Sequence, residues 1–211
     1  QEVRRLAQRL AATAGRRLDE AMPYVDARLT DGTRLHAVLP PLAVDGTAIS
    51  LRVPRHRSFD LDGLVEAGTI DHGGAQWLRA IMASRLAFLV SGGTGCGKTT
   101  VLASLLGLVP HWERIVLVED SAELRPDHPH VVRLQARGAN VEGAGAVPMR
   151  DLVRQSLRMR PDRLVVGEVR GAEVVDLLTA MNTGHEGGCG TVHANAAEDV
   201  PARLQALGVQ A

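Results

Sequence analysis

The sequence predicts an α/β fold: a mostly parallel sheet with helices on both faces, preceded by part of a small α+β N-terminal domain. Short apolar runs at 86–90, 115–118 and 164–166 alternate with stretches of helical spacing, as is typical of buried parallel strands. A Gly-rich segment at 92–97 stands between the first run and a helical stretch at 98–108. Apolar residues make up 45% of the 211-residue chain, which is enough for a folded core.

The N-terminal α+β domain is predicted over 1–53. Apolar residues that share one helical face indicate a helix at 3–14. Asp-Gly pairs at 31–32 and 45–46 supply turns between strands. Three strands are expected, at 24–29, 34–39 and 48–53. A polar stretch follows them, and we assign 54–75 to a linker.

The larger domain is predicted over 76–211, and we expect it to be truncated at its C-terminal end. Besides the stretches named above, helical spacing recurs at 149–159, 174–181 and 202–207. Two further strands are expected, one in a small insertion at 131–136 and a short one at 191–193.

Charge and composition exclude several classes of function. Acidic and basic residues balance at 24 each, and the chain has only two Trp, two Phe and one Tyr. Neither electrostatic attraction nor base stacking therefore favours direct binding of nucleic acid. No apolar run approaches the roughly 20 residues that span a bilayer. The two cysteines form no disulfide framework, so we expect a cytosolic protein without a transmembrane segment.

A phosphate-binding loop is the strongest functional signal. The segment matches the pattern G-x-x-x-x-G-K-[ST] in full, with Gly92, Gly93, Thr94, Gly95, Cys96, Gly97, Lys98 and Thr99. Its glycines let backbone N–H groups converge on phosphates at the N-terminus of the following helix. Lys98, the single lysine of the chain, is expected to reach the β- and γ-phosphates, and the Thr99 hydroxyl to bind Mg²⁺. Thr100 is a candidate for one more phosphate contact.

The two cysteines have ordinary explanations that we prefer. Cys96 occupies a variable position of the loop, where a small filler residue is expected; redox gating of nucleotide binding is the alternative. Cys189 and His193 raise the question of a zinc site, but a second pair of ligands is missing. We therefore predict Mg²⁺ as the only metal.

Two acids follow buried runs and are candidates for the catalytic centre. Glu168 comes directly after the run at 164–166, and Glu119 after the run at 115–118. Parallel strands bring their carboxyl ends to one edge of the sheet, which is also the edge of the phosphate loop. Each acid could instead be a solvated residue at a strand end, but beside the loop we favour catalysis by both. Glu168 is also the predicted Mg²⁺ ligand.

A second Gly-rich polar stretch, 182–195, contains His185 and leads through a strand to His193. A histidine placed there could detect a γ-phosphate by hydrogen bonding without acting as the base. The other candidates, His111, His128 and His130, are interpreted as solvated loop histidines.

An arginine stripe marks one helix, where Arg150, Arg154 and Arg158 recur every four residues. The preferred interpretation is a solvated face offset by Asp151 and Asp162. The alternative is a subunit interface or an arginine supplied to a neighbour's phosphate.

Four segments together resemble a known family. The phosphate loop, 119–123, the strand ending at Glu168, and 183–193 are similar in order to the Walker A, Asp box, Walker B and His box of type II/type IV secretion ATPases. The residues at 157–171 and Thr183-Gly184-His185-Glu186-Gly187-Gly188 resemble most the CpaF-like branch, the ATPases of tight-adherence pili and conjugal-transfer-associated proteins.

The resemblance implies a RecA-like domain in a homohexameric ring, peripheral to the cytoplasmic face of the inner membrane and docked on inner-membrane platform proteins. ATP hydrolysis with Mg²⁺ is then expected to move the N-terminal domain and drive pilin assembly or export. It further implies that Glu168 and Glu119 share the Mg²⁺ and water chemistry, that His193 senses the γ-phosphate, and that Arg52 and Arg55 contact nucleotide.

Three functions remain to be separated. The first is an ATP-hydrolysing motor, which the pair of strand-end acids favours. The second is a nucleotide-gated scaffold that binds ATP with little turnover. The third is a nucleic-acid-translocating ATPase, which zero net charge and scarce aromatics disfavour.

Overall fold

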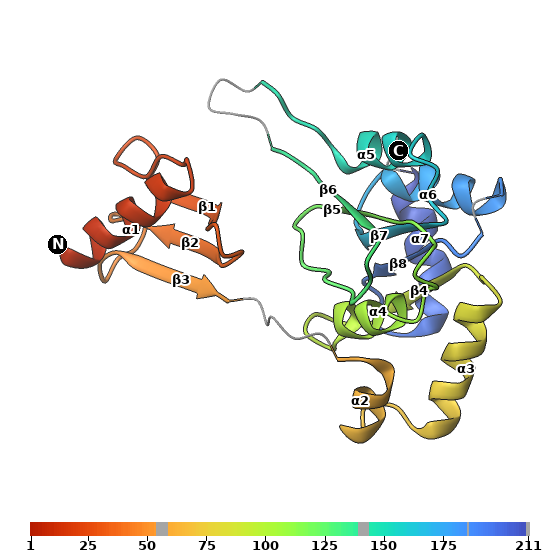
Figure 1. Ribbon diagram of the computed structural model, residues 1–211. Helices are drawn as coiled ribbons and strands as arrows, with labels where there is room; N and C mark the ends of the chain where they lie inside the picture. The colour runs from red at the N-terminus through yellow and green to blue at the C-terminus, as the bar shows by residue number, and fades with distance from the viewer. Residues whose placement is uncertain (54–58, 139–143, 185, 210–211) are drawn as a thin grey trace. The chain divides into compact units, whose positions relative to one another are not determined.

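The computed structural model describes residues 1–53, 59–138, 144–184 and 186–209. The chain divides into two compact units, Gln1–His56 and Arg57–Ala211 (Figure 1). Within the described ranges, no helix combines the length and apolar character needed to cross a membrane.

The first unit is a helix packed on a three-stranded antiparallel sheet. Its elements are α1 (Glu2–Thr13), β1 (Tyr24–Arg28), β2 (Arg34–Val38) and β3 (Ala48–Arg52), with β2 in the middle of the sheet. Residues of α1 such as Ala7 and Ala11 are buried against alternate strand residues such as Val25, Leu35 and Ala37. This period-two burial is what places one face of the sheet against the helix, and the predicted α+β unit is confirmed.

The second unit is built on a five-stranded parallel sheet in the order β4-β8-β7-β5-β6. Its strands are β4 (Phe88–Ser91), β5 (Ile115–Glu119), β6 (Val131–Gln135), β7 (Arg163–Val169) and β8 (Cys189–Val192). Its helices are α2 (Leu61–Glu66), α3 (His72–Ala83), α4 (Lys98–Leu106), α5 (Met149–Leu157), α6 (Glu173–Asn182), the short 3₁₀ helix η1 (Ala197–Asp199) and α7 (Val200–Val209).

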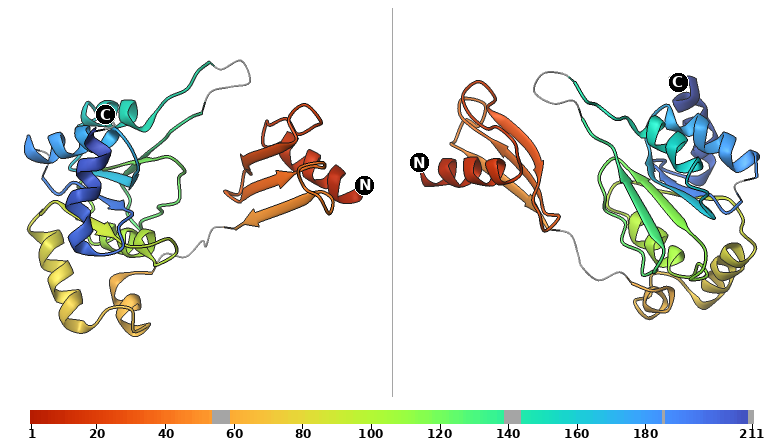
Figure 2. Two further views of the ribbon diagram at one scale, coloured as in Figure 1. Left: turned by 180° about the vertical axis from the view of Figure 1, so that it is seen from behind. Right: turned by 45° about the horizontal axis from the view of Figure 1, so that its top comes forward.

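Helices cover both faces of this sheet, as the two views of Figure 2 show. Leu117 of β5 packs in one cluster with residues of α2, α3 and α4. Its neighbour Val118 packs in the other cluster, with residues of α5, α6 and α7. Successive strand residues point to opposite faces, so a strand buried on both sides is apolar throughout, and the predicted α/β class is confirmed.

Two parts of the second unit differ from the prediction. The segment at 131–136 is not an insertion, because β6 pairs in parallel with β5 from Ile115 with Val131 onward. The expected linker at 54–75 contains α2 and the first residues of α3; its residues 54–58 lie outside the described ranges. Leu61 and Leu64 of α2 are buried, and Leu61 packs in the same core cluster as residues of α4. The N-cap carboxylates of α2 and α3, Asp60 and Asp71, were the signals missed.

A buried ion pair joins several elements at the sheet edge opposite the phosphate loop. The Arg163 side chain at the start of β7 is only 1% exposed, and its Nε donates to Oε2 of Glu113 over 2.7 Å. The other oxygen of Glu113 lies 3.1 Å from Nη1 of Arg85, and Arg163 also donates to the carbonyl of Met82. Gly187 (φ +72°) has no room for a Cβ, which would lie 2.3 Å from Nη1 of Arg163.

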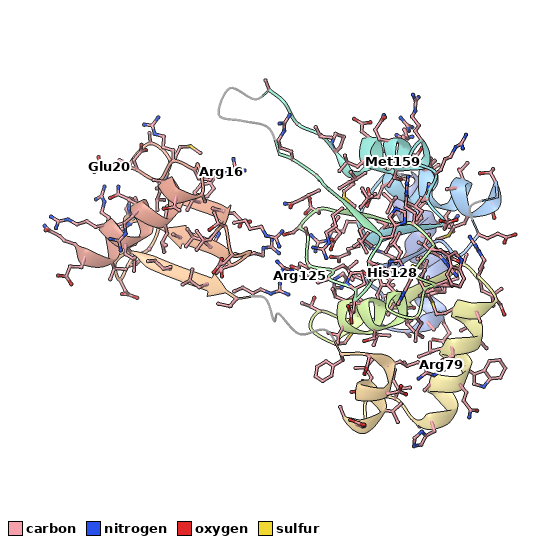
Figure 3. All side chains as sticks on the ribbon, viewed as in Figure 1. Arg16, Glu20, Arg79, Arg125, His128 and Met159 are labelled. Atoms are coloured by element: carbon pink, nitrogen blue, oxygen red, sulfur yellow. The ribbon has the colours of Figure 1, made fainter. Side chains whose placement is uncertain are left out.

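Glu113→Gln tests the energetic importance of this buried pair. The substitution keeps the shape but leaves the buried charge of Arg163 without its anion, so we expect a loss of about 3–5 kcal/mol in unfolding free energy. The control is Arg79→Gln (Arg79 is labelled in Figure 3), which breaks an exposed pair with Asp62 over 2.6 Å. That loss should stay below about 1 kcal/mol. Urea unfolding followed by circular dichroism measures both, and equal losses would contradict the assignment.

Candidate nucleotide-binding site

The phosphate loop joins β4 to α4 through a backbone that only glycine adopts easily. Gly92, Gly95 and Gly97 have φ angles of 150°, 76° and 95°. Gly97 caps the N-terminus of α4 in the left-handed conformation without a side-chain hydrogen bond. The first N–H groups of α4 therefore face the loop with no side chain capping them, an arrangement suited to an anion.

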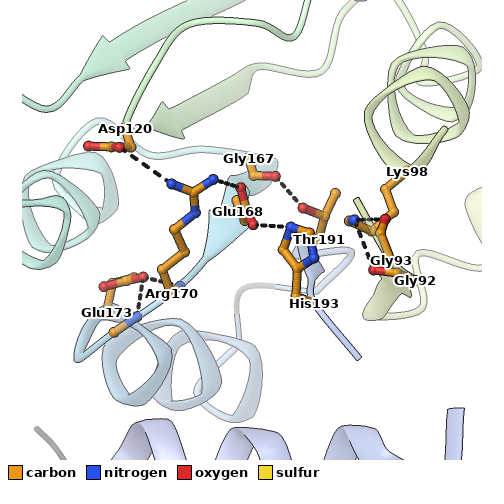
Figure 4. Close-up of polar contacts among 11 residues, drawn as sticks. Gly92, Gly93, Lys98, Asp120, Gly167, Glu168, Arg170, Glu173, Thr191 and His193 are labelled. Carbon is orange, nitrogen blue, oxygen red and sulfur yellow. Dashed lines mark hydrogen bonds and ion pairs between the residues drawn. The ribbon is translucent and has the colours of Figure 1, made fainter. Parts of the chain in front are cut away.

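Lys98, at the start of α4, is held inside this loop. Its side chain donates from Nζ to the carbonyls of Gly92 over 2.9 Å and Gly93 over 2.7 Å (Figure 4). An ammonium group has three N–H donors, so in the described part of the chain one donor remains for a phosphate oxygen. Thr99 is half-buried beside it and Thr100 is exposed.

The register between the neighbouring strands β7 and β8 shifts near the phosphate loop. Val166 pairs with Gly190, whereas Val169 pairs with Val192, so β7 has one extra residue between these pairs. Such a bulge redirects side chains, and here it contains Gly167 and Glu168. The Thr191 hydroxyl donates to the carbonyl of Gly167 over 2.6 Å, which fastens the bulge to β8.

Glu168 and His193, both predicted from the sequence, are brought together at this edge. Nε2 of His193, the first residue after β8, lies 2.7 Å from Oε1 of Glu168 (Figure 4). Ser91 at the end of β4 pairs with Val192, so the phosphate loop and His193 leave the sheet side by side. The Glu168 side chain is 21% exposed and His193 37%, so solvent or a ligand reaches both.

Glu119 lies in different surroundings from Glu168, although both follow buried runs. It is 4% exposed at the end of β5, and its Oε1 accepts the backbone N–H groups of Glu123 and Leu124, each over 2.9 Å. Its Oε2 has no hydrogen-bond partner among the described residues. The side chain fills the space over Gly167, where a Cβ would lie 2.5 Å from its Cγ. Burial raises the pKa of Glu119. Its two backbone hydrogen bonds order the loop after β5.

Arg170 and Glu173 are site residues for which the sequence predicted no role. Nη2 of Arg170 donates to Oε2 of Glu168 over 2.5 Å, and Nη1 lies 3.9 Å from Oδ2 of Asp120 (Figure 4). Glu173, in the first turn of α6, accepts the backbone N–H groups of Arg170 and Gly171. The sequence did contain a signal: Arg170 follows the strand acid Glu168 by two residues, and Glu173 stands at the start of the next helix.

The remaining candidates are spread over the chain. Arg52 ends β3 in the first unit, and Arg55 lies outside the described residues. His185 also lies outside them. Cys189 is fully buried in β8, and burial raises the pKa of its thiol to about 12, so it is a core residue. Cys96 is exposed. Its Sγ lies so close to Gly92 that a Cβ added to Gly92 would be only 2.5 Å from it.

Two surface interpretations need correction. Nε of Arg150 and of Arg154 each lie 2.9 Å from a carboxylate oxygen of Asp176, so these arginines tie α5 to α6 instead of forming a freely solvated face. His128 and His130 are half-buried. Nδ1 of His128 accepts the backbone N–H of His130, and Nε2 of His130 accepts from Nε of Arg114. Asp162, expected to offset the stripe, accepts the backbone N–H of Arg114 over 2.7 Å.

The donors at this edge fit a magnesium nucleotide. Mg²⁺ prefers oxygen ligands and in nucleotide sites takes only one or two from the protein, the rest being phosphates and water. Thr99 and Glu168 offer such oxygens. Among the described residues no group of three or more His, Cys, Asp or Glu side chains could hold a metal ion without other ligands. A phosphate loop does not need such a site, because phosphate and water complete the shell of Mg²⁺.

Glu119→Gln tests whether Glu119 orders its loop as a hydrogen-bond acceptor or must carry a negative charge to do so. Because the pKa of Glu119 is raised from 4.5 in the folded chain, its ionisation lowers stability progressively as pH rises above 4.5. Glutamine still accepts both loop N–H groups, so we expect the variant to be at least as stable as the wild type at pH 7. The advantage should shrink as pH falls towards 4.5.

Urea unfolding at several pH values measures this difference, with the exposed Glu66 changed to Gln as the control for lost charge. A variant less stable than the wild type at pH 7 and equal to it in acid would contradict the burial argument.

Comparison with known proteins identifies the family. The model of the type II/IV secretion system proteins matches residues 1–211. A Mycobacterium tuberculosis protein whose name refers to conjugal transfer is 65% identical over 212 residues, covering 98% of this chain and 60% of the relative. Conjugal transfer protein TrbB of Rhizobium radiobacter is 35% identical, covering 92% of this chain and 58% of the relative. The chain thus spans about 60% of the length of these relatives.

Solved structures agree with the sequence relatives. The VirB11 ATPase of the Brucella suis type IV secretion system superposes with a TM-score of 0.58 at 26% identity, over 97% of this chain and 66% of that one. The pilus retraction motor PilT gives a TM-score of 0.64 at 27% identity, over 86% of this chain and 50% of that one. With its phosphate loop, its strand acids and its match along the whole length, the chain belongs to the type II/IV secretion system protein family.

Proposed function

We propose that the chain is the ATP-hydrolysing core of a motor that powers pilus assembly or protein secretion, in a type II/IV, tight-adherence or conjugal-transfer machine. The observation that carries the proposal is the side-by-side arrangement of Lys98 in its loop and the Glu168–His193 contact on the adjoining strands. The resemblance to VirB11 and PilT supports ATP as the nucleotide.

Each residue at the edge then has a task. The loop N–H groups and the remaining donor of Lys98 bind phosphate oxygens. Thr99 and Glu168 would hold Mg²⁺, which would neutralise negative charge on the phosphates. Glu168 orients the attacking water. Nε2 of His193 lies 2.7 Å from the Glu168 carboxylate, and a γ-phosphate would compete with that carboxylate for the imidazole. Glu119 acts on the chemistry through the loop that it orders.

The assembly is proposed from the relatives. A homohexamer at the cytoplasmic face of the inner membrane, docked on platform proteins, fits the secretion and pilus machines after which VirB11 and PilT are named. Arg52 and Arg55 would reach nucleotide from the first unit in such a ring.

A nucleotide-gated scaffold is the second candidate, and one observation favours it. Both carboxylate oxygens of Glu168 are engaged, one by His193 and one by Arg170. If nucleotide binding does not release them, the carboxylate cannot orient water and turnover stays low.

Two variants separate the candidates. Lys98→Ala removes the phosphate cation, so we expect nucleotide affinity to fall by at least about tenfold and hydrolysis to be lost. Glu168→Gln keeps the shape of the site but not the charge, so binding should persist while turnover falls about 100-fold or more. Arg79→Gln, which breaks an exposed ion pair with Asp62 and lies outside the proposed site, is the control. Nucleotide titration and phosphate release by the full-length protein, with its mass in solution, measure these effects.

Other outcomes point elsewhere. Turnover of Glu168→Gln at the wild-type rate would contradict the catalytic assignment. Tight binding without turnover in an assembled wild-type ring would establish the scaffold. Strong stimulation by single-stranded DNA would revive a nucleic-acid motor.

A further inference from the structure

Arg170 lies among the acids that end two neighbouring strands. Its guanidinium contacts Glu168 of β7 at 2.5 Å and Asp120, just after β5, at 3.9 Å. Glu168, Asp120 and Glu123 all raise the pKa of Arg170, as nearby negative charges do. This arginine is therefore a cation in direct contact with the acids at the edge beside the phosphate loop.

The base of Arg170 is fixed while its head is exposed. Oε1 of Glu173, a residue only 6% exposed, accepts the backbone N–H groups of Arg170 over 2.7 Å and Gly171 over 2.9 Å. The Arg170 side chain is 62% exposed. An exposed ion pair is weak because water competes with it, so the guanidinium can leave Glu168 without disturbing the turn that holds its backbone.

A divalent cation and this guanidinium need the same carboxylate. Glu168 offers two oxygens; His193 lies against one and Arg170 donates to the other. A carboxylate oxygen that accepts a hydrogen bond from arginine has less electron density and less space for Mg²⁺. A cation that contacts both Asp120 and Glu168 offsets the negative charge that the two carboxylates bring to this edge.

We propose that Arg170 is a positioning residue that stands in for Mg²⁺: it holds Glu168 in the nucleotide-free protein and is displaced when a magnesium nucleotide binds. The inference rests on the proposed function, since it needs Mg²⁺ and nucleotide to bind at this edge. It makes the release of Glu168 from Arg170 a step of nucleotide binding, before any hydrolysis.

The test measures ADP binding by the full-length protein across a Mg²⁺ titration, so that it does not depend on turnover. Arg170→Gln removes the competing cation. Arg170→Lys keeps a charge there. Arg133→Gln is the matched control: Arg133 is exposed on β6 and acts electrostatically on the nearby acid Glu119, so its loss removes a charge near the acidic edge without touching Glu168.

In Arg170→Gln we expect the Mg²⁺ concentration for half-maximal ADP binding to fall about two- to fivefold, the equivalent of one exposed charged pair. ADP affinity measured in EDTA should change less than this, Arg170→Lys should stay near the wild type, and Arg133→Gln should leave the Mg²⁺ requirement unchanged. Melting temperatures verify folding, and Arg170→Met, which keeps the aliphatic stem, replaces Arg170→Gln if that variant is unstable.

An unchanged or raised Mg²⁺ requirement in Arg170→Gln, or in Arg170→Met where that variant replaces it, would overturn the inference. An equal effect in Arg133→Gln would also overturn it, because it would show general electrostatics. In those cases wild-type binding of magnesium ADP leaves the proposed function standing. If the wild type binds no nucleotide at all, both proposals fail.

Discussion

The pairing of β7 with β8 is the constraint on which the rest of the site depends. The two strands approach so closely that a Cβ on Gly190 would lie 2.7 Å from the carbonyl of Val166, and immediately beyond this contact β7 gains its extra residue. The bulge sets Glu168 against His193, and the Thr191 hydroxyl holds it in place. Since β8 also pairs with β4, the same strand fixes the distance from the acid to the phosphate loop. A regular ladder would turn Glu168 to the other face of the sheet.

The acids at this edge are of two kinds: Glu119 and Glu173 accept hydrogen bonds from the backbone, and Glu168 contacts the side chains of His193 and Arg170. Glu119 and Glu173 are buried, and each accepts two backbone N–H groups with one oxygen. Such bonds repay part of the cost of burying a carboxylate and fix the turns at 120–124 and 170–172. Among the described residues Glu168 accepts no backbone N–H group, and its carboxylate contacts His193 and Arg170 instead. An acid held by side chains can be exchanged between partners, whereas one held by the backbone cannot move without unfolding its loop.

Much of the fold could be predicted from short stretches of sequence. The features that were missed depend on pairing between residues far apart in the chain. A few consecutive residues specify the buried runs, most helices and the loop between β4 and α4, and the structure confirms these elements. Strand β6 reads as an insertion until its register with β5 is known. Helix α2 has only six residues, too few for a helical pattern to stand out, and the burial of Leu61 and Leu64 appears only in the folded chain. The different surroundings of Glu119 and Glu168 could not be predicted for the same reason, because the space over Gly167 that receives Glu119 exists only in the folded sheet.

Lys98 and Glu168, the two charged groups nearest the proposed ligand, both have partners within the chain. Lys98 donates to its own loop, and Glu168 is held between His193 and Arg170. Ligand binding therefore exchanges contacts within the chain for contacts with phosphate and metal, and the observed affinity is the difference between the two sets. That difference is small for exposed pairs and large for buried ones, so the partly exposed Arg170 and His193 are the partners that can yield. Only a group with several charges placed together, as a magnesium nucleotide has, can replace all of these partners at once. The same exchange offers a physical basis for selecting a complete ligand over free phosphate or free metal, because either alone would leave part of the internal network unmatched.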